Sequence, residues 1–205
     1  MPAGVVMGAD GAARCAWGAS APEYLPYHDL EWGRPVGSDD RVFEKLCLEG
    51  FQGGLSWLTI LRKREGFRAA FARFNPSVVA EFGPSDVERL LADAAIVRNR
   101  AKIMAAIDNA RATLRLRDNG MSVAALVWKY EPSPGRPPPT VDSLPASTPE
   151  SAALSAELRR HGFRFVGPTT VYAAMQSLGV VNDHLEGCHA RVAAQVERAR
   201  FAPPR

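Results

Sequence analysis

Two cysteine–histidine pairs stand at opposite ends of this 205-residue chain and constrain its fold more than any other feature. Cys15 and His28 lie near the start, whereas His184 and Cys188 lie near the end, one helical turn apart. Thiolate sulfur and imidazole nitrogen form the ligand set of many closed tetrahedral zinc sites. If all four bind one ion, the two ends of the chain must meet. Spacing alone leaves this open, because a chain with three cysteines and four histidines offers several pairings.

Four protein ligands would leave no position for water or substrate, so a zinc ion bound in this way would be structural. His189 adjoins Cys188 and is an alternative ligand, whereas Cys47 follows Leu46 in an apolar stretch and is expected in the core. His161 precedes Gly162 at an expected helix end, where it could cap carbonyl groups. A purely structural metal moves the search for chemistry to other residues.

The composition is that of a globular protein of one domain, with 46% hydrophobic and 23% charged residues. We find no secretory signal and no apolar run of membrane-spanning length. Three cysteines cannot all pair with one another. These features predict a cytoplasmic protein with reduced thiols and no membrane partner.

The net charge of +3 is too small to indicate nucleic-acid binding from composition alone. Basic residues nevertheless cluster near 62–64, 98–102, 111–117 and 159–160. Solvated helix faces explain such clusters equally well.

Apolar residues recur at helical spacing from about residue 39 onward, which predicts an all-α fold without a strand. We expect helices to begin near residues 39, 57, 76, 85 and 168, and to span 99–117, 121–130 and 149–160. Ser56 and Asn75 are expected N-caps, and Ser85 with Glu88 fits a capping box. Residues 1–13 are small and are expected to be flexible.

Aromatic residues crowd around His28, and Glu49 directly follows the apolar run 46–48. A buried carboxylate needs a partner. An aromatic pocket with one acid would suit a flat, cationic ring. An aromatic core with one surface glutamate is the alternative interpretation.

Five separated motifs resemble, in order and approximate spacing, those of the DNA-3-methyladenine glycosylase I family. They are RCAW at 14–17, YHDLEWG at 27–33, LEGFQGGLSW at 48–57, GFRFVG at 162–167 and GVVNDH at 179–184, followed by Cys188. The similarity extends from about residue 14 to residue 188.

The resemblance implies a helix-hairpin-helix DNA glycosylase fold over residues 14–188, with the hairpin near 86–117. A flexible extension at 1–13 and a tail at 189–205 flank it. A zinc snap, with one structural Zn²⁺ per chain, joins the ends through Cys15, His28, His184 and Cys188. The implied activity is hydrolytic excision of 3-methyladenine flipped out of damaged double-stranded DNA, the first step of base excision repair.

The resemblance also assigns roles to individual residues. Glu49 matches the pocket acid that contacts the flipped base. Leu55, beside Gly54, matches the residue that fills the gap left in the DNA stack. The aromatic wall comprises Tyr24, Tyr27 and Trp57, with Trp17 and Trp32 as further members. Phosphates would be held by Arg98, Arg100 and Lys102.

The segment 93–102 falls where the DNA-gripping hairpin should lie, but it departs from the family pattern. Such hairpins usually contain glycine, which permits positive φ and close approach of the backbone. Ala95 and Ala101 stand here instead, which puts the hairpin geometry in question.

Two other classes of function compete with the glycosylase. A zinc-stabilised DNA-binding module without catalysis would need no acidic pocket. A metal hydrolase would need an open metal position, which four protein ligands exclude. No lysine is placed by sequence as a Schiff-base nucleophile, which favours a monofunctional hydrolase without strand cleavage. We expect the protein to be a monomer.

Overall fold

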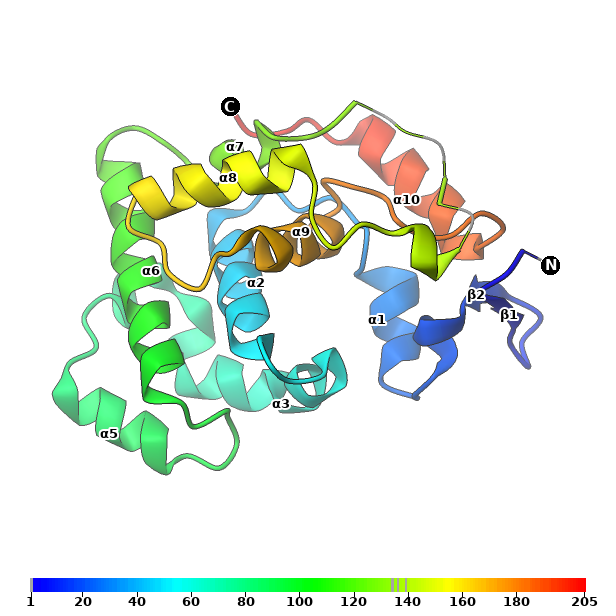
Figure 1. Cartoon of the computed structure of the whole chain (residues 1–205). Helices are drawn as coiled ribbons and strands as arrows, with labels where there is room; N and C mark the ends of the chain where they lie inside the picture. Colours follow the sequence, from blue (N-terminus) through cyan, green and yellow to red (C-terminus); the bar gives the residue numbers. More distant parts are fainter. Residues whose placement is uncertain (1, 134, 136, 139) are drawn as a thin grey trace.

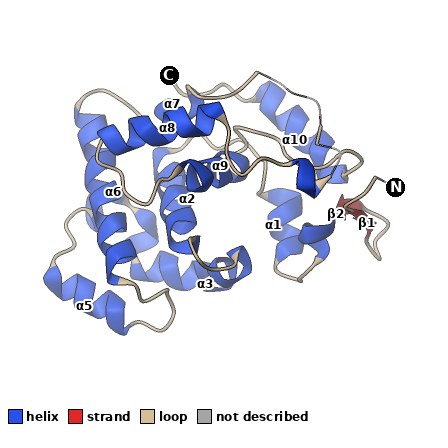
Figure 2. Ribbon diagram, viewed as in Figure 1, coloured by secondary structure: helices blue, strands red, loops and turns tan. Residues whose placement is uncertain are grey.

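Helices make up nearly all the regular structure of the computed structural model, as the sequence predicts (Figure 2). The model describes residues 2–133, 135, 137, 138 and 140–205. The α-helices are α1 Tyr24–Leu30, α2 Asp39–Gln52, α3 Trp57–Ala70, α4 Pro76–Val79, α5 Pro84–Ala92, α6 Arg100–Asp118, α7 Val123–Trp128, α8 Pro149–Arg160, α9 Pro168–Ser177 and α10 His189–Arg200. Short 3-10 helices are η1 Ala16–Ala19, η2 Ala72–Phe74 and η3 Val141–Ser143.

The expectation of no strand is wrong at the N-terminus. Strands β1 (Val5–Met7) and β2 (Ala13–Cys15) form an antiparallel pair in which Val5 lies opposite Cys15. Three-residue strands are too short to show a reliable alternation of polar and apolar residues. The hairpin brings Cys15 into a buried position at its end.

Several helices begin at the caps that the sequence predicts. Ser56 Oγ accepts the Thr59 N–H at 3.2 Å, and Asn75 Oδ1 accepts the Ser77 N–H at 3.0 Å. The predicted box at Ser85 is wrong, because α5 begins at Pro84 with Gly83 as its cap. Proline suits this first helical position, since its missing N–H would have no partner there.

Helix α2 lies at the centre of the molecule, between α9 on one side and α3 and α6 on the other (Figure 1). Its residues enter two buried clusters. Phe51 packs on Phe67 of α3 and Phe43 on Phe74 of η2, while Val42 and Leu46 belong to a cluster with residues of α7, α8 and α9. Each fully buried side chain of this size contributes about 1.5–3 kcal/mol of burial free energy. The helix is therefore a rigid platform for Glu49.

The connection between α5 and α6 forms a hairpin without left-handed alanines. Positive φ among the described non-glycine residues occurs at Ala72, Arg73, Phe74 and Phe165, so Ala95 does not need it. Ala101 lies inside α6. Asn99 caps that helix by accepting the Lys102 N–H at 3.1 Å. The alanines are thus compatible with a hairpin at the predicted place.

The start of α10 lies beside α1 and the N-terminal strands, whereas the C-terminus itself lies on the other side of the molecule, near α7 (Figure 1). Helix α10, within the segment expected to be a tail, packs against α1 and β2. Among the described residues, no helix is both long and apolar enough to cross a membrane.

Candidate functional site

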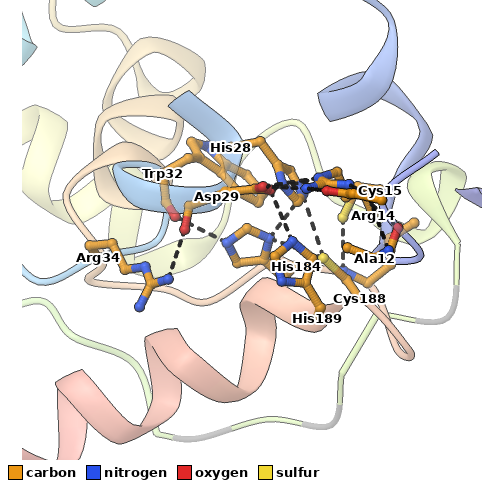
Figure 3. A network of polar contacts seen from close by, with 12 residues as sticks. Ala12, Arg14, Cys15, His28, Asp29, Trp32, Arg34, His184, Cys188 and His189 are labelled. Carbon is orange, nitrogen blue, oxygen red and sulfur yellow. Dashed lines mark hydrogen bonds and ion pairs between the residues drawn. The ribbon is translucent and has the colours of Figure 1, made fainter. Parts of the chain in front are cut away.

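A buried cluster joins the two ends of the chain, as predicted from the cysteine–histidine pairs (Figure 3). The ligand atoms of Cys15, His28, His184 and Cys188 all lie within 4.8 Å of one another. His28 Nε2 lies 3.3 Å from His184 Nδ1 and 3.5 Å from Cys188 Sγ, which lies 3.6 Å from His184 Nδ1. Tetrahedral zinc, with bonds of about 2.0–2.3 Å, would space its ligands by roughly 3.3–3.8 Å. The spacing of the four ligand atoms is therefore compatible with a metal site.

The outer nitrogens of both histidines fix their tautomers. His28 Nδ1 lies 2.7 Å from Asp29 Oδ1, and His184 Nε2 lies 3.0 Å from the Trp32 carbonyl oxygen. If each outer nitrogen donates its proton, the inner nitrogen turns a lone pair toward the cluster. Metal-bound histidines are oriented in this way by carboxylates and backbone carbonyls.

The two thiols of the cluster, Cys15 and Cys188, shift each other's pKa in opposite directions. The hydrogen bond with Cys15 lowers the pKa of Cys188 far below that of an ordinary thiol and raises the pKa of Cys15. The Leu185 N–H donates to Cys15 Sγ at 3.3 Å and would stabilise a second thiolate. His189 lies outside this set, with Nε2 at 3.0 Å from Asp29 Oδ1.

A separate cavity of about 350 Å³ opens between α1, α2 and α9. Its volume lies in the usual range of small-molecule sites. Every pocket residue predicted from the sequence lines it: Trp17, Tyr24, Tyr27, Trp32, Glu49 and Trp57. Trp17 is the centre of the wall, since its ring meets Tyr24 and Trp32 edge-on at 5.5 and 4.9 Å. Because Glu49 is buried and lines this cavity, the alternative interpretation of a surface glutamate is wrong.

Glu49 is the acid of this cavity and is 5% exposed. Burial raises its pKa to about 7, and the charge of Lys45 opposes that rise. A carboxyl group with such a pKa exists in both protonation states near neutral pH. Perturbed acids in a cleft are typical of functional sites.

Lys45 stands one helical turn before Glu49 and was missed by the sequence analysis. Its Nζ lies 5.0 Å from the centroid of the Tyr27 ring, a cation–π distance. Burial lowers its pKa to about 8, against the opposing charges of Glu31 and Glu49. Its i, i+4 spacing from Glu49 was the available signal.

Two glutamines also line the cavity. Gln52 follows Glu49 on α2, and Gln176 comes from α9. Gln176 Nε2 donates to Asp183 Oδ2 at 2.8 Å, and the Tyr172 hydroxyl donates to the same oxygen at 2.6 Å. Asp183 thus fixes the Gln176 side chain. No sequence signal placed α9 beside α2.

The turn after α2 presents Leu55 to solvent. Gly54 has φ +82°, and Gln52 closes the turn because its side-chain amide donates to the Leu55 carbonyl at 2.7 Å. Leu55 is 39% exposed. An apolar side chain held outward beside a pocket is consistent with its predicted wedge role.

The three predicted phosphate contacts differ in their surroundings. Arg98 is exposed in the hairpin, and Arg100 pairs with Glu88 at 2.8 Å. Lys102 Nζ instead donates to the Phe51 and Gly53 carbonyls at 2.8 and 2.5 Å. Lys102 therefore ties α6 to the turn that carries Leu55.

A helical scaffold with a turn between α5 and α6, and an aromatic cavity that holds one acid, is the architecture of the helix-hairpin-helix class of DNA glycosylases. Within that class, residues 17–191 match the family model described as methyladenine glycosylase, and the chain belongs to that family.

Several glycosylases are similar to this chain over most of its length. DNA-3-methyladenine glycosylase 1 of Escherichia coli strain K12 is 47% identical over 178 residues, covering 85% of this chain and 95% of its own. A crystal structure of 3-methyladenine DNA glycosylase I matches with a TM-score of 0.83 and 47% identity, over 86% of this chain and 98% of that one. A Staphylococcus aureus structure describing 3-methyladenine recognition matches with a TM-score of 0.82 and 33% identity, over 87% and 96%.

Proposed function

We propose that this protein is a monofunctional DNA glycosylase that hydrolytically removes 3-methyladenine from alkylated double-stranded DNA. The observation that carries the proposal is the cavity lined by aromatic rings around one buried carboxyl group, Glu49. Relatives of the same family bear this activity in their names. A damaged base must leave the duplex to reach such a cavity.

The chemistry of the substrate explains why a pocket with a single acid suffices. Methylation at N3 gives adenine a formal positive charge, and the base leaves as a neutral molecule. Strong general-acid catalysis is therefore unnecessary. The aromatic faces of Tyr27 and Trp17 would stack on the cationic ring, and Glu49 would accept hydrogen bonds from its donors.

Trp57 supplies a further polar group. Its Nε1 is buried and has no hydrogen-bond partner among the residues that the structure describes. A buried donor without a partner is costly, so an acceptor on the bound base would relieve that cost. Trp57 and Glu49 would then recognise the base through opposite hydrogen-bonding roles.

Leu55 would fill the vacancy in the DNA stack, and Arg98 and Arg100 of the hairpin would contact phosphates. The change Leu55→Ala should weaken binding to duplex DNA that contains an abasic site, and leave binding of free 3-methyladenine nearly unchanged. A greater loss for the free base would contradict the wedge role.

The metal is proposed to be one structural Zn²⁺ per chain, held by the Cys₂His₂ cluster. When bound, the ion would cross-link β2, α1 and the segment before α10, which carry its four ligands. Because four side chains complete the tetrahedron, the ion takes no part in hydrolysis. A monomer acting in the cytoplasm completes the proposal.

Chromatography of bases released from methylated duplex DNA tests the function. The wild type should release 3-methyladenine, and Glu49→Gln should remain folded while releasing it roughly 10- to 100-fold more slowly, the size of a lost hydrogen bond to a charged group. A wild-type protein that binds damaged DNA without releasing a base would be a DNA-binding module instead.

A further inference from the structure

The motif GFRFVG at 162–167 received no function from the sequence, yet it holds an exposed aromatic residue in a strained conformation. Phe165 has φ +54° and is 42% exposed. Left-handed backbone is unfavourable for a bulky residue, and such strain gathers at functional sites. An exposed phenylalanine in this conformation therefore needs an explanation beyond packing.

Buried side chains hold this backbone in place. Asn109 of α6, which is 2% exposed, donates to the Arg164 carbonyl at 3.1 Å and accepts the Arg164 N–H at 2.7 Å. The Ser155 hydroxyl donates to the Val166 carbonyl at 2.6 Å. The residues on both sides of Phe165 are thus fixed, and its orientation is built into the fold.

Phe165 lies next to the turn that carries Leu55. The connection between α8 and α9 descends between α6 and α2 (Figure 1). A Cβ added to Gly50 would lie 3.3 Å from the Phe165 Cβ, so glycine allows the two segments to touch. Phe165, Gly50 and Lys102 line one small hollow at this contact. Lys102 Nζ also donates to the Gly53 carbonyl, within the turn that carries Leu55. Phe165 and Leu55 therefore flank the last turn of α2.

We propose that Phe165 is a second apolar contact with the DNA stack, and that it packs on a base exposed beside the lesion while Leu55 fills the gap. This inference rests on the proposed glycosylase function. The partner that contacts Phe165 is DNA rather than protein, because Phe165 adjoins the turn that carries Leu55 and the basic start of α6. Aromatic side chains that meet unstacked bases gain stacking energy without sequence preference.

Affinity for a duplex that contains a stable abasic-site analogue tests this role. Phe165→Ala should weaken that binding by about tenfold, the size of one lost base–aromatic contact. Free 3-methyladenine should bind as tightly as to the wild type. Met121→Ala is the matched control, since Met121 is equally exposed at 42% but lies in the connection between α6 and α7. Unchanged duplex binding by Phe165→Ala would overturn the proposal.

A fluorescent 2-aminopurine beside the abasic site provides a second readout at saturating protein. The wild type should change its fluorescence through altered stacking, and Phe165→Ala should change it clearly less, by the part that Leu55 alone produces. If the alanine variant does not fold, Phe165→Leu keeps the apolar bulk and should show an intermediate loss. Equal losses for duplex and free base would overturn the role, since they would indicate a general support of the pocket.

The proposed function is tested apart from this role by the wild type alone. If it releases no 3-methyladenine, the glycosylase function fails. If it releases the base while Phe165→Ala binds the abasic duplex normally, only the role of Phe165 fails.

Discussion

Glu49 couples the chemistry of the pocket to pH. Because its pKa of about 7 lies above the ordinary 4.5, the protonated form is favoured in the folded protein. Its contribution to stability is therefore present below about pH 4.5 and is lost as the pH rises through about 7. Only the ionised form is purely an acceptor, because the protonated carboxyl group carries an O–H donor.

The rate of excision should thus rise with pH through about 7, as Glu49 loses its proton. Single-turnover base release measured between pH 5.5 and 8.5 checks this, and Glu49→Gln should show no such rise. At pH 8 the glutamine variant should be more stable than the wild type, by roughly 1–3 kcal/mol in urea unfolding. A flat wild-type profile would contradict the role of the ionised carboxylate.

Lys45 sets where that transition falls. Its positive charge lowers the pKa of Glu49, so removing it should move the pH profile of excision to higher pH by about one unit. Lys45→Met keeps the apolar stem beneath Tyr27 and removes the charge. Lys45→Arg is the control, because it keeps the charge and should leave the profile near its wild-type position.

At the scale of elements, the hairpin between α5 and α6 depends on its caps. Asn99→Ala should destabilise the protein by about 1 kcal/mol, since the first turn of α6 loses the acceptor for the Lys102 N–H. Asn99→Ser keeps a capping oxygen and should cost less. Urea unfolding followed by circular dichroism measures both variants. Equal stability of the wild type and both variants would show that the Asn99 cap does not contribute to the free energy of unfolding.

Helix α10 shows why some elements escaped the sequence analysis. Its buried residues include Ala190 and Ala194, whereas Val192 is 64% exposed. The helix packs on α1 and β2 through these small alanines, so its buried face contains few large apolar side chains. Its valines lie on the exposed face. Helices α6 and α8 were found because their buried stripes contain large side chains and their starts carry Asn99 and Pro149.

The sequence motifs predicted the acid and the aromatic wall of the pocket, but not the residues that α9 contributes. Glu49 and Trp57 share one motif with Leu55, and the motifs of residues 14–33 supply the remaining aromatic wall. Gln176 belongs to a helix far along the chain that reaches the cavity through core packing against α2. Local patterns carry no information on such a contact, and neither do they indicate the left-handed backbone of Phe165.

At the scale of the molecule, the cluster of Cys15, His28, His184 and Cys188 connects the two terminal segments to the pocket. His28 neighbours Tyr27 on α1, and the Trp32 carbonyl that orients His184 belongs to a residue of the pocket wall. A Cβ on Gly18 would lie 2.5 Å from the His28 ring, so the segment carrying Trp17 packs directly on a ligand. Loss of the metal should loosen the aromatic wall as well as the ends.

Cys15→Ser should therefore lose the metal and open both ends of the chain, while the core around α2 stays folded. Elemental analysis should find about one zinc per wild-type chain and little in the variant. Limited proteolysis should then cut β1–β2 and the segment before α10 first, because the ligands no longer hold them together. Cys47→Ser is the control, since that cysteine is buried away from the cluster and should leave the zinc content unchanged. A zinc-free wild type that resists proteolysis at both ends would contradict the cross-link.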